Sequence, residues 1–137
     1  MRILIVSILV LVASFATAGN RVGFIDALIQ VESSGNDTAV GDGGKAVGCL
    51  QIWQVVIDDV NRVYHTNYRA PDRMDRRKSI EICVKYLAFW GKRYEKKTGR
   101  KCTREILARI WNGGPNGYDK KNTVEYWNKV KMALESE

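Results

Sequence analysis

Glycine-rich turns divide this chain into short segments, and that division constrains its fold more than any other feature. Within the segments, apolar residues recur every three or four positions, which is the spacing of one helix face. We expect five helices, over about residues 22–33 and 52–64, from Asp75 to Gly99, from Thr103 to Gly113, and from Asn122 or Thr123 onward. Strand signals are weak. The sequence therefore predicts a single, mainly α domain, with room for a very small β element between residues 37 and 48.

The first 18 residues have a different character from the rest of the chain. Arg2 is followed by an apolar run over residues 3–12 and by Ala16-Thr17-Ala18. A basic start, a short apolar stretch and a small-x-small site are typical of a secretory signal peptide. The alternative is an uncleaved signal anchor, although a membrane span needs about 20 apolar residues. We expect cleavage after Ala18, a secreted or periplasmic mature chain over residues 19–137, and no stable membrane insertion.

The charge balance is basic, with 22 Lys and Arg residues against 15 Asp and Glu residues, a formal net charge of +7. A small basic exported protein is attracted to polyanions such as nucleic acid, anionic lipid or bacterial cell wall. The basic residues are spread along the chain instead of concentrated in one helix or ribbon, which argues against a nucleic-acid partner. Most of them are explained equally well as solvated surface. We expect a monomer.

Three cysteines leave at least one thiol without an intrachain partner. Cys83 and Cys102 flank an expected helix end and the loop after it, so we predict a disulfide between them. Cys49 lies in an apolar stretch and is expected to be a small buried hydrophobic residue. There is no Cys-x-x-Cys spacing, and His65 is the only histidine. We therefore expect no metal site and no cofactor.

Glu32 is the acidic residue whose position most suggests chemistry. It follows Val31 at the end of the first expected helix, just before Ser33-Ser34-Gly35. In a partly apolar cleft, desolvation favours the neutral form of a carboxyl group. An acid still protonated near neutral pH can donate its proton to a glycosidic oxygen. Taken alone, however, a glutamate near a helix end is more commonly a solvated surface charge.

Four segments of the chain, taken together, change that balance. In order, they resemble the motifs of lytic transglycosylases with the soluble-transglycosylase (SLT) domain, of the lysozyme-like superfamily. The segments are Val31–Asn36 with Ala39-Val40, Ala46–Ile52, Ala108–Pro115 and Thr123–Val130. The corresponding family motifs are Glu-Ser-Ser/Gly-Asn, Ala-x-Gly-Leu-Met-Gln-Ile, Ala-Tyr-Asn-Ala-Gly-Pro and Glu-Thr-x-x-Tyr-Val-x-x-Val. The resemblance covers nearly all of residues 19–137 and implies a lysozyme-like α fold.

The resemblance also implies roles for individual residues. Glu32 matches the catalytic glutamate, Gln51 and Asn112 match residues of the sugar-binding cleft, and Tyr126 matches a tyrosine close to the catalytic carboxyl. Trp111 stands where the family has a tyrosine, and it could stack on a sugar face. Structural explanations stay open for three of them. Gln51 would tie backbone groups, Asn112 would cap a helix and Tyr126 would fill the core.

The chain departs from the family pattern near the second motif. Cys49-Leu50 replaces the usual Leu-Met, and Gly41 replaces a serine thought to orient the N-acetyl group of the sugar. The segment from Asp42 to Lys45 is inserted. Trp53 and Tyr118 are further candidates for stacking on sugars, and Trp53 could equally belong to the core.

Glycosidases normally use two carboxyl groups. No second acid stands in a setting as apolar as that of Glu32; Asp37, Asp42, Asp58 and Asp59 are the candidates. A one-carboxyl mechanism fits this pattern better, and the family resemblance implies a one-carboxyl lytic transglycosylase that acts on peptidoglycan glycan strands. It would cleave the β-1,4 bond between N-acetylmuramic acid and N-acetylglucosamine and form 1,6-anhydromuramic ends.

Three other functions remain open. The closest is a hydrolytic muramidase similar to goose-type lysozymes, with Asp42 as a candidate second carboxylate. The others are a non-catalytic cationic protein that binds the cell wall and a glycosidase that acts on chitin. Analysis of the reaction products, the effect of Glu32→Gln, and uncharged chitin oligomers would separate them.

Overall fold

The computed structural model describes residues 22–136, so the expected signal peptide, residues 1–18, lies outside it. The chain forms five α-helices and two very short strands, with 3-10 turns between them. The helices are α1 (Phe24–Ser33), α2 (Gln54–Tyr64), α3 (Arg76–Thr98), α4 (Arg104–Gly113) and α5 (Val124–Glu135). Strands β1 (Val40–Gly41) and β2 (Ala46–Val47) pair antiparallel around the 3-10 turn η1 (Asp42–Gly44). The predicted single, mainly α domain with a very small β element is confirmed.

Three predicted helix boundaries are confirmed by their capping interactions. The Asp75 carboxylate accepts the backbone N–H of Lys78 at 2.9 Å at the start of α3. Thr103 Oγ1 accepts the N–H of Ile106 at 3.3 Å at the start of α4. Gly99 ends α3 in the left-handed conformation, with φ of 69°, where glycine carries no steric penalty.

Helices α1 and α2 begin two residues later than the sequence pattern predicts. For α2 the reason is a β-bridge between Ile52 and Val47. The Ile52 N–H donates to the Val47 carbonyl at 2.9 Å, and the Val47 N–H donates back at 3.2 Å. Because Ile52 is held in this extended pair, the helix starts only at Gln54.

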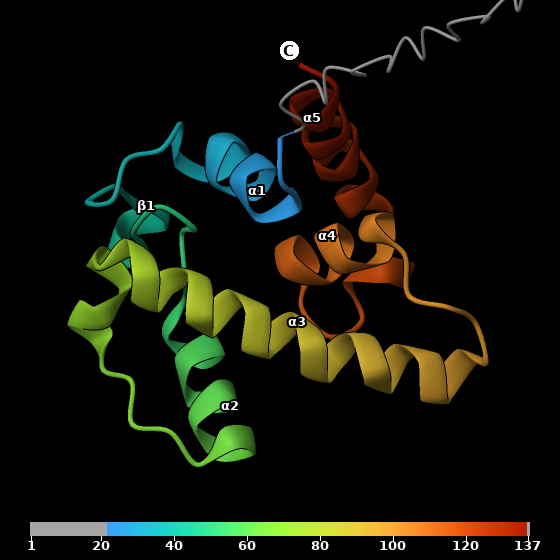
Figure 1. Ribbon diagram of the computed structural model, residues 1–137, viewed down its shortest axis with the longest axis horizontal. Helices are drawn as coiled ribbons and strands as arrows, with labels where there is room; N and C mark the ends of the chain where they lie inside the picture. The colour runs from blue at the N-terminus through green and yellow to red at the C-terminus, as the bar shows by residue number, and fades with distance from the viewer. Residues whose placement is uncertain (1–21, 137) are drawn as a thin grey trace, which may run out of the picture.

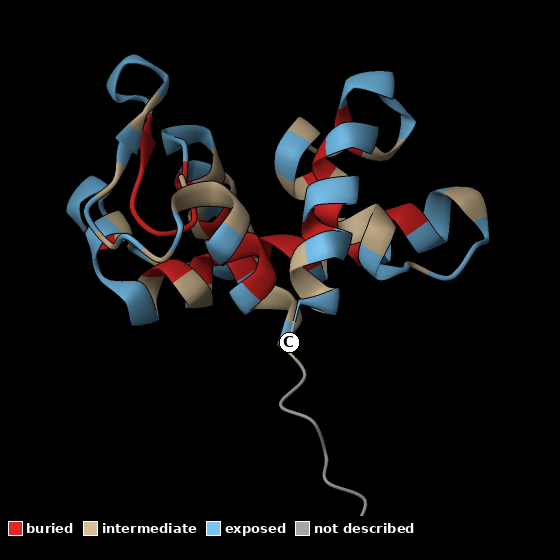
Figure 2. Cartoon of the chain, turned by 90° about the horizontal axis from the view of Figure 1, so that it is seen from above, coloured by how far each residue is buried: buried red, intermediate tan, exposed pale blue. Residues whose placement is uncertain are grey.

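Helix α3 runs along the length of the molecule, with α2 on one side of it and α1, α4 and α5 on the other in Figure 1. The buried residues lie through the middle of the molecule, and the exposed ones lie on its outer ends (Figure 2). Fully buried side chains come from each long element: Leu28, Ile57, Ile82, Ile110 and Val130. Burial of each such side chain contributes about 1.5–3 kcal/mol.

The connection between α4 and α5 is fixed by a buried threonine in the 3-10 turn η4 (Lys121–Thr123). Thr123 Oγ1 donates to the Gly117 carbonyl at 2.7 Å and accepts from Arg109 Nε at 2.9 Å. Gly117 lies in a further turn, η3 (Gly117–Asp119), and a side chain there would overlap the Arg109 carbonyl. These contacts place α5 against α4.

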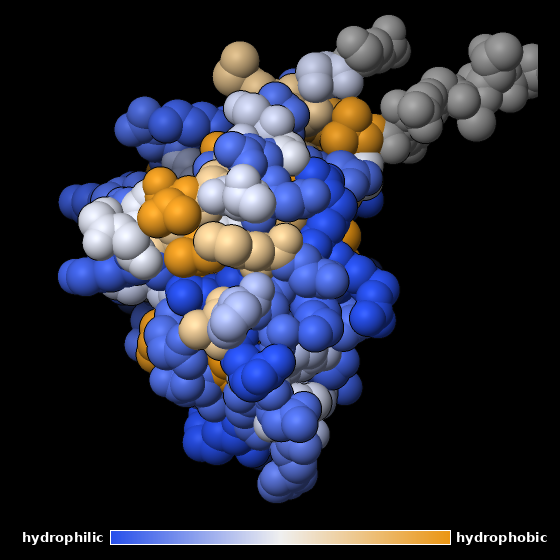
Figure 3. Space-filling view, turned by 90° about the vertical axis from the view of Figure 1, so that its left-hand side faces the viewer, coloured by the Kyte–Doolittle hydropathy of each residue, from blue (hydrophilic) through white to orange (hydrophobic). Residues whose placement is uncertain are grey.

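The face on the hairpin side of the molecule is largely hydrophilic and carries only small groups of hydrophobic residues (Figure 3). Within residues 22–136, no helix combines the length and the hydropathy needed to cross a bilayer.

The predicted disulfide between Cys83 and Cys102 is wrong. The three cysteines are free thiols. Cys102 packs against Gly91 of α3, with its Sγ 3.4 Å from where a Cβ would stand. Gly91 lies eight residues beyond Cys83 on the same helix, a rise of about 12 Å, whereas a disulfide requires Cα atoms within about 7 Å. Cys49 is fully buried, as predicted.

Candidate active site

Glu32 lines a cleft of about 750 Å³. The walls of the cleft come from α1, the hairpin, α2, α3 and the end of α4. The other lining residues are Asp42, Gln51, Ile52, Trp53, Val55, Val56, Asp59, Arg62, Tyr86, Trp90, Trp111, Asn112, Gly114 and Pro115. Segments far apart in the sequence thus meet around one carboxyl group.

The position of Glu32 is fixed by the way α1 ends. Ser34 takes a left-handed conformation, with φ of 53°, and its N–H caps the Gln30 carbonyl. Ser33 Oγ donates to the backbone carbonyl of Cys49 at 2.8 Å, which ties the last turn of α1 to the segment after the hairpin. The carboxyl group of Glu32 is therefore held at the edge of the core and faces the cleft.

Burial raises the pKa of Glu32 to about 7, from an ordinary value of 4.5. Desolvation is the largest cause, and the negative charge of Asp42 adds to it. Hydrogen bonding from Tyr126 and, more weakly, from the indole of Trp111 acts in the opposite direction. A carboxyl group with this pKa is about half protonated at neutral pH, so it can act as a proton donor there.

Tyr126 is the direct partner of Glu32. This tyrosine is buried on α5, and its Oη donates a hydrogen bond of 2.7 Å to Glu32 Oε1. Burial and the neighbouring carboxylate raise the pKa of Tyr126 well above its ordinary value. The phenol therefore stays protonated and remains a donor over the whole neutral range. The structure brings together the two residues that the family motifs indicated.

Gln51 lines the cleft and also ties backbone groups of the hairpin. Its Nε2 donates to the carbonyls of Ala39 at 3.1 Å and Gly48 at 2.9 Å. Its Oε1 faces Gly41, and a side chain at Gly41 would overlap that oxygen. The amide of Gln51 thus occupies the space in which a serine at position 41 would have to fit.

Trp111 and Trp53 are among the aromatic residues that line the cleft. Trp111 on α4 packs edge-on against Tyr86 of α3, with ring centroids 5.8 Å apart. Trp53 is 41% exposed and therefore is not a core residue, and Lys45 Nζ lies 5.6 Å from its ring. Both indoles are placed where they could contact a sugar face.

Of the two remaining predicted residues, one lines the cleft and the other does not. Asn112 is exposed and lines the cleft. Tyr118, the third candidate for stacking, does not line it. Its ring packs against Tyr94, with centroids 4.8 Å apart, in a neighbouring pocket.

Trp90 and Asp59 form a contact across the cleft that the sequence pattern did not reveal. Trp90 Nε1 donates to Asp59 Oδ2 at 2.7 Å, which joins α3 to α2. Asp59 also pairs with Arg62. Helical spacing places Trp90 on a face with core residues, but it does not show that the indole edge reaches the cleft.

Asp42 is the acid best placed to act together with Glu32. Two of the other candidates are engaged elsewhere, because Asp37 pairs with Arg76 at 2.8 Å and Asp58 accepts from Gln54 at 2.9 Å. Asp59 lines the cleft but is bonded to Trp90 and Arg62, whereas Asp42 is exposed in the cleft. Across the described part of the chain, no group of three His, Cys, Asp or Glu side chains could hold a metal ion.

Comparison with known proteins identifies the family to which this chain belongs. The family model for the transglycosylase SLT domain matches residues 16–132. The chain is also similar to Lysozyme 1 of Crassostrea virginica, with 28% identity over 99 residues, which cover 67% of this chain and 53% of the oyster protein. The chain therefore spans about half the length of that relative. Because the family model covers most of the sequence, this chain belongs to the transglycosylase SLT domain family.

Proposed function

We propose that this protein cleaves the β-1,4 bond between N-acetylmuramic acid and N-acetylglucosamine in peptidoglycan, with Glu32 as the acid. The observation that carries the proposal is the carboxyl group itself, which is partly buried in a 750 Å³ cleft with its pKa raised to about 7. Such a group can protonate the leaving oxygen at neutral pH. Membership of the SLT family supports the same substrate.

In the transglycosylase form of the reaction, the Glu32 carboxyl gives its proton to the glycosidic oxygen while the bond from that oxygen to the anomeric carbon breaks. The N-acetyl oxygen of the muramic acid stabilises the positive charge that develops on that carbon. The Glu32 carboxylate then takes the proton of the muramic 6-hydroxyl, whose oxygen bonds to the anomeric carbon and closes the 1,6-anhydro ring. The hydrogen bond from Tyr126 holds one carboxyl oxygen of Glu32 through both steps.

Hydrolysis of the same bond is the second candidate, and Asp42 is the observation that favours it. Asp42 lines the same cleft, and its negative charge raises the pKa of Glu32. A second carboxylate facing the acid is the usual arrangement for glycosidases that use water. The similarity to a protein named as a lysozyme points in the same direction.

Mass spectrometry of the muropeptides released from purified sacculi separates these reactions. Anhydromuramic ends, lighter than reducing ends by one water, support the transglycosylase, and reducing ends support the muramidase. In the second case Asp42→Asn should abolish activity, whereas a transglycosylase should tolerate this change. If the wild type releases no fragment from sacculi, the result supports the alternative of a non-catalytic protein that binds the cell wall. Release from chitin oligomers but not from sacculi would identify a chitin-type glycosidase.

The proposed substrate lies outside the cytoplasm, so we also propose a secreted or periplasmic, monomeric protein whose partner is the glycan strand. The proposal fits the signal peptide predicted over residues 1–18. Intact mass of the exported protein tests it, because cleavage after Ala18 leaves a chain that starts at Gly19. Retention of residue 1 in the exported form would support the signal-anchor alternative instead.

A further inference from the structure

A second pocket, of about 530 Å³, adjoins the catalytic cleft. Its lining residues are Trp90, Arg93, Tyr94, Lys96, Lys97, Pro115, Asn116 and Tyr118. Trp90 and Pro115 line both this pocket and the cleft. A ligand that lies in the cleft can therefore extend past these two residues into the second pocket.

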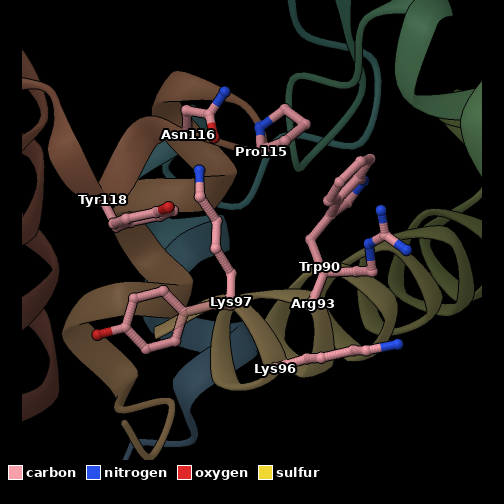
Figure 4. A pocket seen from close by; sticks show the side chains of 8 residues that line it. Trp90, Arg93, Lys96, Lys97, Pro115, Asn116 and Tyr118 are labelled. Atoms are coloured by element: carbon pink, nitrogen blue, oxygen red, sulfur yellow. The ribbon is translucent and has the colours of Figure 1, made fainter. Parts of the chain in front are cut away.

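The second pocket is positively charged. Arg93 and Lys97 lie on the same face of α3, one helical turn apart. In Figure 4, Lys97 extends toward Asn116 and Tyr118, and Arg93 extends beside Trp90. None of the eight lining residues is acidic. Among the ion pairs within residues 22–136, none involves Arg93, Lys96 or Lys97.

The acid nearest in sequence does not neutralise these cations. Glu95 uses its carboxylate to accept the backbone N–H of Cys102 at 2.9 Å, and it lines a different pocket. The Arg93 guanidinium lies 5.9 Å from the ring of Phe89, which restricts its motion. Arg93 and Lys97 thus line an open pocket and make no ion pair within the described residues.

An aromatic wall completes the pocket. Tyr118 packs against Tyr94 almost at a right angle, with centroids 4.8 Å apart, and Asn116 adds an amide. Aromatic and amide groups beside cations suit a peptide that carries carboxylates, because the rings contact its apolar parts and the amide bonds its backbone. A guanidinium binds a carboxylate through two parallel hydrogen bonds.

We propose that this pocket binds a carboxylate of the stem peptide attached to the glycan strand in the cleft, with Arg93 and Lys97 as its partners. The inference rests on the proposed function. In peptidoglycan the stem peptide is attached to the lactyl group of muramic acid, so it leaves the strand beside the sugar bound in the cleft. The second pocket therefore recognises the peptide-bearing form of the substrate.

Binding of two matched ligands tests the proposal. One is a peptidoglycan tetrasaccharide with its stem peptides, and the other is the same compound with the peptide carboxylates converted to amides. Calorimetry on Glu32→Gln protein avoids cleavage during the measurement. We expect the free-carboxylate ligand to bind roughly tenfold more tightly than the amidated one at low salt. Adding Arg93→Gln and Lys97→Gln should remove this preference.

A matched control removes the same charge elsewhere. Lys121→Gln with Lys131→Gln changes two exposed lysines outside both pockets, and it should keep the tenfold preference. Equal binding of the two ligands, or a preference that survives the loss of Arg93 and Lys97, would overturn the inference and leave the proposed function standing. Failure of both ligands to bind would instead count against the proposed function. If Arg93→Gln with Lys97→Gln weakens only the binding of purified teichoic acid, the pocket binds a phosphate polymer and the proposal is wrong.

Discussion

The hydrogen bond of 2.7 Å from Tyr126 Oη to Glu32 Oε1 joins two residues that are 94 positions apart in the sequence. It connects the end of α1 to α5, the last helix of the described chain, and these two helices pack against each other. The proposed acid is therefore oriented by a donor that is distant in the sequence but adjacent in the fold.

Glu32→Gln should abolish cleavage of sacculi, because the amide cannot donate the proton that the leaving oxygen requires. General acid catalysis contributes about 10²- to 10⁴-fold, so we expect a loss of at least a hundredfold. The assay is release of soluble muropeptides, with circular dichroism as the check on folding. Activity within a few fold of the wild type would show that another group supplies the proton.

The raised pKa of Glu32 makes two pH-dependent properties predictable. Cleavage should fall as the pH rises through about 7, where the carboxyl loses its proton. The folded protein binds this proton more tightly than the unfolded chain, so the contribution to stability is complete below pH 4.5 and is lost as the pH rises toward 7. The loss amounts to about 3 kcal/mol. Urea unfolding at several pH values measures it, and Glu32→Gln should remove this part of the pH dependence.

Tyr126→Phe should raise the pKa of Glu32 further, because the hydrogen bond from the phenol lowers it. The alkaline limb of the activity profile should move to higher pH. Loss of the bond should also reduce the free energy of unfolding by about 1 kcal/mol. Tyr64→Phe is the control, since Tyr64 donates to the Lys85 carbonyl at an exposed site and should leave the limb in place. A limb that moves to lower pH in Tyr126→Phe would contradict the structure.

Gly41→Ala should disturb Gln51 without straining the backbone. Gly41 has an extended conformation, with φ of −132°, that any residue adopts, but its new Cβ would overlap Gln51 Oε1. Because Nε2 of that amide is held by two carbonyls, the overlap should cost about 1–3 kcal/mol of stability and raise KM. A double-mutant cycle with Gln51→Ala checks the cause. In the Gln51→Ala background, Gly41→Ala should reduce the stability little further, because the amide that it would overlap is gone. Equal losses of stability in the two backgrounds would refute the assigned contact.

The three cysteines should be free thiols that differ in their accessibility to solvent. Cys102 is partly exposed, whereas Cys49 and Cys83 are buried. We expect alkylation of the native protein to label Cys102 alone, as mass spectrometry of tryptic peptides would show. A reducing agent should leave Tm unchanged. A clear drop in Tm would indicate a disulfide, whose loss typically costs about 2–5 kcal/mol.

Local signals in the sequence predicted most of the fold. The boundaries at Asp75, Gly99 and Thr103 depend on capping chemistry within a few residues, and the structure confirms them. Local signals could not locate the start of α2, because Ile52 pairs with Val47 only when the turn between these two residues forms. The Cys83–Cys102 prediction failed for a similar reason, since proximity in sequence does not show that Cys102 returns to α3 beside Gly91.

The motifs indicated which residues surround Glu32 but not how they are bonded. No sequence pattern shows that Gln51 Nε2 ties the carbonyls of Ala39 and Gly48, or that Trp90 reaches Asp59. Lys96 and Lys97 in the last turn of α3 suit the negative end of a helix, and the sequence alone gives them no further role. Only the position of this end of α3 beside Pro115 shows that it forms a pocket next to the cleft.

The pairing of α1 with α5 has a consequence for the order of events during synthesis. A ribosome-bound chain that has not yet emerged as far as Tyr126 already carries the proposed acid, but it lacks the phenol that orients it. On this structure, Glu32 would gain its hydrogen bond and its full burial only when α5 docks against α1.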